Sequence, residues 1–469
     1  MPAPDAVIAA LDARFDRTLE ELCELARIPG VSAPGFEPRE LERSAERVAA
    51  LCDDCGLAGV EVLRTGGAHP YVVAEWQGAG REAPTALVYA HHDVQPPGRL
   101  DRWETPAFEP TLREDGRLYG RGVVDDKAGL FVHLAALRGW LEVEGGLPIN
   151  LKLVVEGEEE IGSPHLAQFL GEQRQRLAAD VLVLSDTANL ETGLPSLTTS
   201  LRGLVSVDVR VRALDHPLHS GMWGGPVRDA ATALAELLGR LVDPHGDPAI
   251  PGLCDDLQAP DPATLAALAE LPFDLERFRT DAGLVADAQL AGDPAVPVYE
   301  RLWLRPAVAV TALEGMPLAS AANQLMAEAR ARVGVRLAPG QDPERVARLV
   351  RDFLSHDPPG GVEVATEVAA CAGGWQTEPV GPAFDAARRA LELGFGRPAV
   401  AIGCGGTIPF VEPFAQVLGG VPALLLGLED PICNAHGENE SLHLGDFGKA
   451  MRSSAHLLAE LAAVPRLSS

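Results

Sequence analysis

The sequence predicts an α/β protein in two parts: a mostly parallel sheet covered by helices, split in the chain by an inserted α+β domain. Segments with helical periodicity alternate with short, nearly continuous apolar runs, which are typical of parallel strands buried on both faces. From residue 204 the strands instead alternate apolar and polar residues, and after residue 371 the first pattern returns. A chain of 469 residues is also too long for one ordinary core, so more than one domain is expected.

The first part, residues 1–203, opens with helical periodicity from residue 5 to about 57, broken at Pro29-Gly30. Two short strands, 60–63 and 71–76, precede the first apolar run. The next elements are expected in the order strand 85–90, helix 128–144, strand 149–155, helix 164–177 and strand 180–184. This alternation of helix and apolar strand predicts the parallel sheet.

The inserted part, residues 204–371, shows a different order of elements. The pattern predicts strand 205–211, helix 227–242, strand 307–312, strand 328–337, helix 343–354 and strand 362–368. This β-α-β-β-α-β order matches the split ferredoxin-like arrangement. Residues 372–469 then return to the first sheet, with helix 382–393, strand 399–402, the apolar run 422–428 and helix 444–461.

Composition and charge argue against several classes of protein. With 67 acidic and 39 basic residues, the formal net charge is −28, which argues against binding nucleic acid or an anionic membrane. Residues 1–17 carry mixed charge unlike a signal peptide, and no apolar run is long enough to span a bilayer. Seven scattered cysteines, an odd number, are typical of a reducing compartment. We therefore expect a cytoplasmic protein with no nucleic-acid or membrane partner.

Acidic and histidine side chains follow several of the predicted strands at the point where each strand ends. They are His91, Asp93, Glu159, Glu160, Asp186 and, in the loop after run 422–428, His436. Ligands of parallel sheets collect beyond the carboxyl ends of the strands, so these side chains are expected at one edge. The four acids within residues 156–160 could by themselves be a loop of an acidic protein. Their shared placement with the histidines favours a divalent metal site.

Two histidines and three or four carboxylates suit Zn²⁺ or Mn²⁺. There are more carboxylates than one tetrahedral ion needs, which favours two ions about 3.5–4 Å apart. A carboxylate outside the ligand set could then act as a general base. The sequence lacks the G-x-S-x-G motif of many serine hydrolases, and Gly120-Arg121-Gly122 lacks the third glycine of a dinucleotide-binding fingerprint.

Seven short motifs occur in a characteristic order along the chain. They are His91-His92-Asp93-Val94-Gln95-Pro96, Gly120-Arg121-Gly122-Val123-Val124-Asp125-Asp126-Lys127, Glu156-Gly157-Glu158-Glu159-Glu160-Ile161-Gly162-Ser163, Ser185-Asp186, His219-Ser220-Gly221, Gly405-Gly406-Thr407-Ile408-Pro409 and the His436 loop. Over almost the whole chain this order resembles the M20 metallopeptidases, especially the branch of cytosolic non-specific dipeptidase and carnosinase. The resemblance implies a catalytic domain, residues 1–203 and 372–469, split by a lid domain, residues 204–371, that also forms a homodimer.

The resemblance also implies roles for the residues at the sheet edge. His91 and Asp186 would bind one metal ion, Glu160 and His436 would bind the other, and Asp125 would bind both. Asp93 would hydrogen-bond His91 and orient it. Glu159 would be the general base; the run Glu158-Glu159-Glu160 does not itself separate base from ligand. The Asp125–Asp126 peptide bond is expected to be cis.

Residues that would contact the substrate follow from the same resemblance. His219 would reach into the partner subunit's site and steady the oxyanion, although a histidine before Gly221 could also serve only in a turn. Asn323 resembles a lid asparagine that assists there. Arg336, on an alternating strand, would grip the terminal carboxylate of the substrate, which suits its fork of donors; a solvated strand arginine is the alternative. Backbone and hydroxyl donors for the same end are expected from Gly405, Gly406 and Thr407.

The expected function is hydrolysis of the peptide bond of dipeptides, with a metal-bridging water as nucleophile and Glu159 as base. The cofactors would be two divalent ions, Zn²⁺ first, with Mn²⁺ or Co²⁺ as alternatives. Two other functions stay open: an amidohydrolase acting on N-acyl or carbamoyl amino acids, and an inactive metal-binding module that contacts proteins. The sequence departs from the family pattern at three places, namely His92, Glu158 and the pair Gly403-Cys404, and the pair puts the choice of substrate in doubt.

Overall fold

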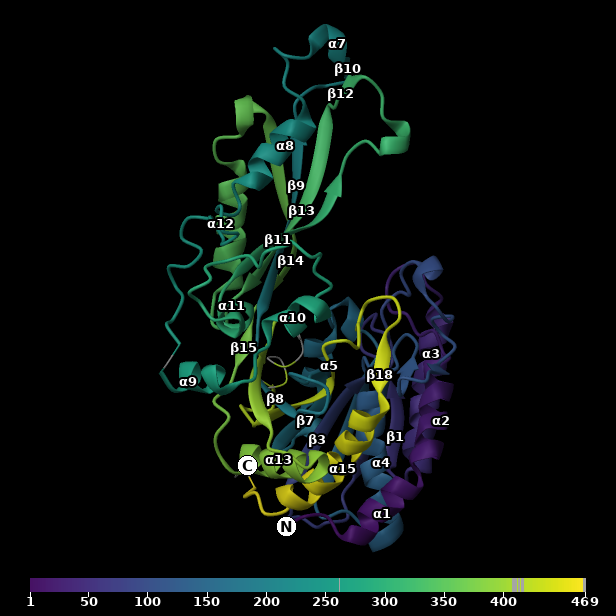
Figure 1. The fold of residues 1–469 in the computed structure, drawn as a ribbon. Coiled ribbons are helices and arrows are strands. Elements are labelled where there is room, and N and C mark those ends of the chain that lie inside the picture. The colour runs from purple at the N-terminus through teal and green to yellow at the C-terminus, as the bar shows by residue number, and fades with distance from the viewer. Residues whose placement is uncertain (261, 407–410, 412–413, 415–416, 467–469) are drawn as a thin grey trace. The chain divides into compact units, whose positions relative to one another are not determined.

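The computed structural model describes residues 1–260, 262–406, 411, 414 and 417–466 (Figure 1). The chain divides into two compact units. The first unit contains Met1–Thr199, Glu378–Ile402 and Pro409–Ser469, and the second contains Ser200–Thr377 and Gly403–Ile408. Among the described residues, no helix combines the length and apolar character needed to cross a bilayer.

The largest sheet is built mainly from the first unit. Its described strands are β1 (Ala58–Leu63), β2 (Tyr71–Trp76), β3 (Thr85–His91), β6 (Asn150–Glu156), β7 (Val181–Ala188), β8 (Ser196–Leu201), β15 (Trp375–Gln376), β16 (Val400–Cys404) and β17 (Ala423–Glu429). They run in the order β1-β2-β6-β3-β7-β17-β8-β15, with β16 beside β8. The neighbours β6, β3, β7 and β17 are parallel, whereas the flanking pairs β1–β2, β2–β6, β17–β8 and β8–β15 are antiparallel.

Burial explains why the parallel strands read as unbroken apolar runs. Every residue of β3 is buried, as is every residue of β6 except Lys152. A strand covered on both faces has no solvated side to alternate with. Parallel pairing also aligns the carboxyl ends of these strands, and it places His91 opposite Glu156. The sheet therefore gathers polar residues at one edge.

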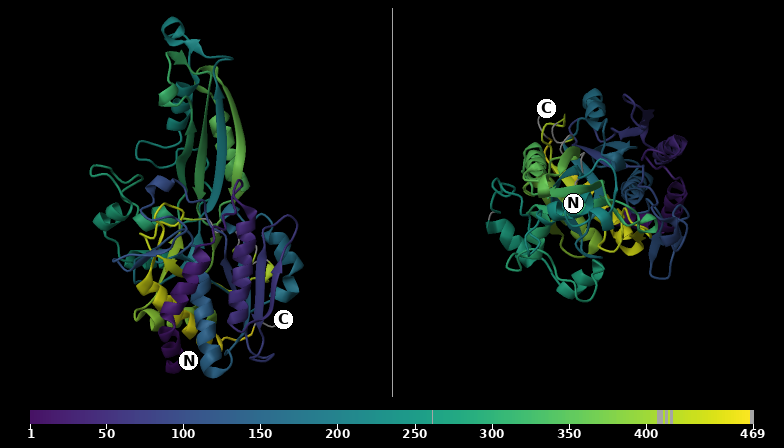
Figure 2. Two further views of the ribbon diagram at one scale, coloured as in Figure 1. Left: turned by 90° about the vertical axis from the view of Figure 1, so that its right-hand side faces the viewer. Right: turned by 90° about the horizontal axis from the view of Figure 1, so that it is seen from above.

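Helices complete the first unit. They are α1 (Asp5–Ala13), α2 (Phe15–Ala26), α3 (Pro38–Asp54), α4 (Lys127–Glu144), α5 (Leu166–Glu172), α6 (Arg174–Leu177), α13 (Pro382–Phe395) and α15 (Leu444–Leu461). Helix α4 packs against β3 and β7 and against α1, α2 and α15, so nearly all its sides are buried. Figure 2 shows the N-terminal helices, in purple, running along the strands of this unit. A small sheet joins β4 (Thr111–Leu112), β5 (Arg117–Tyr119) and β18 (Ser441–His443).

The second unit contains an antiparallel sheet with helices on one face. Its strands are β9 (Gly203–Arg212), β11 (Ala307–Glu314), β13 (Glu328–Leu337) and β14 (Glu363–Ala372), in the order β11-β13-β9-β14. Alternate residues of β9, such as Val207 and Val209, are buried beneath α8 (Ala230–Gly239) and α12 (Pro343–Ser355). The predicted α/β fold class with its β-α-β-β-α-β insertion is confirmed. Short elements also occur here: β10 (Leu218–His219), α7 (Ser220–Trp223), α9 (Pro262–Glu270), α10 (Leu275–Asp281), α11 (Val298–Trp303) and β12 (Gln324–Leu325).

Two local predictions differ from the structure. The helix predicted over 164–177 is two short helices, α5 and α6, which meet at Gln173. Gly171 weakens helix formation just before this break. Strand β8 was not predicted, because its sequence Ser-Leu-Thr-Thr-Ser-Leu lacks a clear apolar pattern even though most of it is buried.

Candidate metal centre

The five side chains predicted as metal ligands come from five segments of the first unit. His91 ends β3, and Asp186 lies near the end of β7. Asp125 precedes α4, and Glu160 lies in a short 3-10 turn, η2 (Glu159–Ile161), directly after β6. His436 lies in the loop after β17. Two of the five residues thus lie at or near strand ends, two lie in a turn and a loop that follow strands of the same sheet, and Asp125 lies in the turn before α4.

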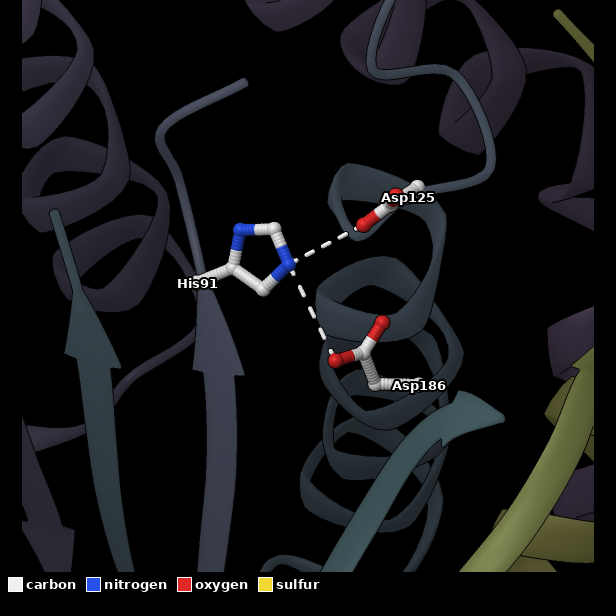
Figure 3. A group of neighbouring side chains, drawn as sticks. All are labelled: His91, Asp125 and Asp186. Carbon is white, nitrogen blue, oxygen red and sulfur yellow. Dashed lines mark hydrogen bonds and ion pairs between the residues drawn. The ribbon is translucent and has the colours of Figure 1, made fainter. Parts of the chain in front are cut away.

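These side chains form two groups that share Asp125. In the first group, His91 Nε2 lies 3.1 Å from Asp125 Oδ1 and 3.8 Å from Asp186 Oδ2 (Figure 3). In the second, His436 Nε2 lies 3.0 Å from Asp125 Oδ2 and 3.2 Å from Glu160 Oε2. The two oxygens of Asp125 therefore face different groups. Within each group the donor atoms lie within 4.8 Å of one another, close enough to converge on one cation.

The electrostatics of this cluster fit divalent cations. Burial raises the pKa of Asp186 well above its usual range, and the neighbouring carboxyls of Asp126 and Asp125 raise it further. Burial opposes charge on His91, but hydrogen bonds to Asp125 and Asp93 raise the pKa of its imidazole well above the ordinary value. Without metal ions, the raised pKa values of Asp186 and His91 thus favour protons on these groups. Metal ions bind deprotonated carboxylates and neutral imidazoles and would replace those protons.

Asp93 contacts both groups of ligands. His91 Nδ1 lies 3.1 Å from the backbone oxygen of Asp93 and 3.4 Å from its Oδ1. The same carboxylate accepts hydrogen bonds from the backbone N–H groups of Glu159, at 3.2 Å, and Glu160, at 3.0 Å. The sequence indicated only the link to His91. In the structure this fully buried carboxylate also fixes the backbone of the acidic turn.

The two acids of η2 have different surroundings. Glu160 accepts hydrogen bonds from the backbone N–H of Gln95 at 3.0 Å and from Gln95 Nε2 at 2.7 Å, which orient its carboxylate. Burial raises the pKa of Glu159 well above its usual range; His91 lowers this pKa, and the carboxyls of Asp186 and Glu160 raise it. A carboxyl with a raised pKa can accept and return a proton. Burial and the Asp125 carboxyl also raise the pKa of Glu160, so the hydrogen bonds from Gln95, and not the direction of the pKa, distinguish the two acids.

Glu429 is a further acid near Asp125 that was not predicted. It is the last residue of β17, and burial followed by the nearby Asp125 raises its pKa to about 8. Like Asp186, Glu429 is an acid at the end of an apolar run. A search for acidic residues at the ends of predicted strands could therefore have found it. The cis Asp125–Asp126 peptide bond implied by the family resemblance is present.

Comparisons with known proteins identify the family of this chain. The model of peptidase family M20/M25/M40 matches residues 87–460. The chain is 33% identical to a cysteinylglycine-S-conjugate dipeptidase of Corynebacterium striatum, covering 91% of each chain. The chain belongs to this M20 family. It is 27% identical to the human Beta-Ala-His dipeptidase, over 94% of this chain and 85% of the relative. The solved structure of human carnosine dipeptidase 1 superposes with a TM-score of 0.88 at 25% identity, over 99% of this chain and 100% of that one.

The second unit of this M20 chain carries the predicted substrate residues. His219 and Asn323 are brought together, because β10 pairs with β12 and the Ser220 N–H donates to the Asn323 carbonyl at 2.8 Å. His219 Nδ1 accepts from the Gly221 N–H at 3.1 Å. A neutral imidazole that accepts at Nδ1 carries its proton on Nε2. His219 is exposed, so this N–H is a donor at the surface of the unit.

Arg336, Gly405 and Gly406, which are also predicted to bind the substrate, lie elsewhere in the same unit. Arg336 is half-buried on β13, and its burial lowers the pKa of the guanidinium. The carbonyl of Gly405 accepts from Arg202 Nε at 3.3 Å, and the N–H of Gly406 lies 3.3 Å from Cys404 Sγ. Thr407 lies outside the described residues. Arg202 was not predicted; it follows β8, the strand that the sequence pattern did not indicate.

Two departures from the M20 pattern support the acidic turn. The His92 ring donates from Nε2 to the carbonyl of Pro70 at 2.9 Å. Glu158 is 1% exposed, and its carboxylate accepts from the Tyr71 hydroxyl at 3.0 Å and the His165 N–H at 2.9 Å. A buried carboxylate needs such donors. Glu158 therefore ties residues 69–71 and 165 to the turn that holds Glu159.

In the third departure, Gly403-Cys404, the glycine is explained by Trp303 of α11. A Cβ at position 403 would lie 2.6 Å from Trp303 Cβ and 2.8 Å from Ser200 Oγ. The indole is buried and stacks on Tyr299, with ring centroids 4.6 Å apart. A larger residue at 403 is therefore excluded by this packing, and the aromatic pair occupies its place.

Proposed function

We propose that this M20 peptidase is a dipeptidase that uses two divalent metal ions. The observation that carries the proposal is the position of Asp125, whose two carboxylate oxygens face two separate ligand groups. The relatives in Corynebacterium striatum and in humans are a cysteinylglycine-S-conjugate dipeptidase and a Beta-Ala-His dipeptidase. Substrates of the same size, two residues joined by one peptide bond, are proposed for this chain.

His91 and Asp186 would hold one ion, Glu160 and His436 the other, and Asp125 both. Imidazole and carboxylate donors favour Zn²⁺, with Mn²⁺ or Co²⁺ as alternatives. When bound, such ions supply Lewis-acid polarisation of the carbonyl and make water a stronger acid. Asp93 positions His91 and the backbone of Glu159 and Glu160 through the contacts described above.

Glu159 would move the proton. Its carboxylate accepts a proton from the attacking water and then passes it to the nitrogen of the leaving amine. The carboxyls around it and its burial raise its affinity for the proton, which suits a group that must hold the proton between these two steps. Arg336 would bind the terminal carboxylate of the substrate through its planar fork, together with Gly405, Gly406 and Thr407.

His219 would donate its Nε2–H to the oxyanion in the site of a partner subunit, assisted by Asn323. This role supports a homodimer in which residues 204–371 form the lid and residues 1–203 and 372–469 the catalytic domain. All seven cysteines are free thiols, which supports a cytoplasmic location because such thiols persist in a reducing compartment.

A hydrolysis screen on metal-stripped protein refilled with Zn²⁺, Mn²⁺ or Co²⁺ tests the proposal. The expected result is two ions per chain and faster hydrolysis of dipeptides than of N-acetyl or carbamoyl amino acids. Preference for the acylated amino acids would replace the dipeptidase with an amidohydrolase. No hydrolysis with both ions bound would leave a metal-binding module, and at most one ion per saturated chain would refute the two-ion centre.

A further inference from the structure

Arg121 and Glu440 form a buried ion pair between the loop that carries Asp125 and the loop that carries His436. Arg121 Nη1 lies 2.7 Å from Glu440 Oε2, and the two side chains are 2% and 0% exposed. The Gly120 N–H also donates to the backbone carbonyl of Glu440 at 3.0 Å. The ion pair therefore joins two segments that are more than 300 residues apart in the chain and that meet at the metal centre.

Glu440 fixes the backbone that leads to Asp125. Its Oε2 accepts from the N–H of Gly122 at 3.0 Å. Its Oε1 accepts from the N–H groups of Val124, at 3.1 Å, and Asp125, at 3.3 Å. Because a carboxylate accepts strong hydrogen bonds from several donors at once, these contacts set the direction in which the Asp125 side chain leaves the chain.

Arg121 fixes the backbone of the His436 loop. Its Nη2 donates to the carbonyls of His436 at 3.1 Å, Gly437 at 3.0 Å and Pro96 at 3.1 Å. Only a guanidinium presents enough donors, in a rigid plane, to bind Glu440 and these carbonyls together. A lysine at this position would keep the charge but lose the fork.

His436 needs this support more than the other histidine ligand does. Its side chain is 60% exposed, and its φ is 63°, a left-handed conformation in a loop without strand neighbours. The ring of His91 is fully buried at the end of a parallel strand. The imidazole of His436 is therefore placed by its own backbone, and Arg121 binds that backbone at the residue itself.

We propose that Arg121, held in place by Glu440, is a positioning residue that acts mainly on the ion held by Glu160 and His436. Its own donors reach the backbone of His436, whereas they reach Asp125, which would bind both ions, only through Glu440. The proposal rests on the two-ion function given above. It predicts that loss of the fork at Arg121 weakens one of two metal-binding steps. Residues that support a ligand from behind typically change metal affinity 10–100-fold.

The test is a titration of metal-stripped protein with Co²⁺ alone, read by calorimetry and by the visible absorption of the bound ion. His436→Ala first identifies which binding step belongs to the Glu160–His436 ion. In Arg121→Lys, the Kd of that same step should rise about 10–100-fold, and the other step should change less than about threefold. Arg117→Lys is the matched control: Arg117 is 6% exposed and binds Asp430 through two hydrogen bonds of 2.7 and 2.8 Å, and it also contacts Ser441.

The control separates positioning from general stability. Both lysine variants should lower the melting temperature of the metal-free protein, but only Arg121→Lys should weaken the step assigned by His436→Ala. Equal weakening of both steps by Arg121→Lys, no change in either, or the same effect from Arg117→Lys would overturn the proposal. Wild-type protein that binds fewer than two Co²⁺ ions would instead refute the function on which it rests.

A second variant keeps the proposal testable if Arg121→Lys does not fold. Glu440→Gln removes the charge that holds the guanidinium and keeps one oxygen, which can accept either from the Gly122 N–H or from the N–H groups of Val124 and Asp125. The step assigned by His436→Ala should weaken, and unchanged binding of both ions, or a larger loss at the other step, would count against the proposal. The change in Co²⁺ absorption at that binding step should also differ from wild type, because the absorption depends on how the His436 ring is oriented toward the ion.

Discussion

The two ligand groups of the centre have the same chemistry but different supports. His91 and Asp186 stand at the ends of parallel strands, with side chains 0% and 7% exposed, so the register of the sheet places them. Glu160 and His436 lie in a turn and a loop, and polar contacts from Gln95 and Arg121 place them. The comparison teaches that the register of a packed sheet places the backbone of a strand-end ligand, whereas the backbone of a ligand in a turn or a loop is placed by hydrogen bonds from other side chains.

We call the group of His91 and Asp186 the strand side of the centre, and the group of Glu160 and His436, with the adjacent Glu159, the loop side. The largest expected effect is on the rate of the reaction, from a substitution on the loop side. Glu159→Gln removes the proposed proton acceptor while keeping its size, so kcat for a dipeptide should fall by about 10²–10⁴-fold. Metal content, measured on the same samples, should stay at the wild-type value, because Glu159 is not a proposed ligand. Near wild-type turnover would show that another group moves the proton.

The neighbouring acid provides the control for this prediction. Glu160→Gln should lower the bound metal as well as the rate, because an amide is a poorer ligand than a carboxylate for a hard dication. If the Glu160 variant kept both ions and lost only kcat, Glu160 would be the proton acceptor and Glu159 the metal ligand. The comparison between two adjacent residues thus separates the base from the ligand.

The next effect is on the free energy of unfolding, from a substitution in the sheet that carries His91 and Asp186. Leu153 of β6 is 0% exposed, whereas Leu100, on the loop after β3, is 68% exposed. Leu153→Ala should lower the free energy of unfolding by about 2–5 kcal/mol, because it leaves a cavity beneath the sheet. Leu100→Ala should change it by less than about 0.5 kcal/mol. Denaturant titration of the metal-free variants measures both free energies of unfolding. Equal effects would mean that the buried core of the sheet contributes no more to stability than the exposed loop does.

The same contrast explains what the sequence could predict. The ends of apolar runs located His91, Asp93, Glu159, Glu160 and Asp186, because parallel pairing forces such residues to one edge of a sheet. The β-α-β-β-α-β order of the insertion could also be predicted, since one face of its sheet is buried and the pattern alternates. The assignment of roles within the run Glu158-Glu159-Glu160 came from the family resemblance alone.

The supports of the loop side could not be predicted in this way. Arg121 and Glu440 were visible only as parts of motifs, and no periodicity relates residues that meet through two loops. The packing of Trp303 against Gly403 likewise joins an irregular insertion to a strand end. Strand β8 was missed because hydroxyl side chains occupy much of it. The Ser196 hydroxyl donates to the carbonyl of Leu194 and accepts from the N–H of Leu190, and the hydroxyl of the half-buried Thr199 donates to the carbonyl of Ile402.

Asp93 contacts ligands of both groups, so its substitution tests whether the two groups are supported independently. Asp93→Asn keeps the shape but places an amide N–H₂ group against either a backbone N–H or the His91 side. Metal affinity or kcat/KM should fall about 10–100-fold, with both Co²⁺ binding steps affected, unlike Arg121→Lys. Loss of only one step would assign Asp93 to that side alone. Asp93→Ala should be at least as severe, because it leaves the N–H groups of the turn without their acceptor.

The smallest effect concerns a buried histidine behind the strand side. His133 of α4 is hydrogen-bonded to Ser185, next to Asp186, at 3.2 Å and to Ser454 at 3.0 Å. Burial lowers its pKa to about 4, below the value of about 6.5 expected in the unfolded chain.

The sign of the pH dependence follows from these two values. Between pH 6.5 and 4 the unfolded chain binds a proton at His133 that the folded protein does not, so stability falls as the pH falls. Relative to His133→Gln, which does not titrate, wild type should lose about 1 kcal/mol between pH 6.5 and 5.5 and show no such change above pH 7.5. Taking the difference between the two proteins at each pH cancels the carboxylates common to both. A difference that stays constant across this range would mean that His133 is protonated inside the fold, and the hydrogen bonds to Ser185 and Ser454 would then have to be reassigned.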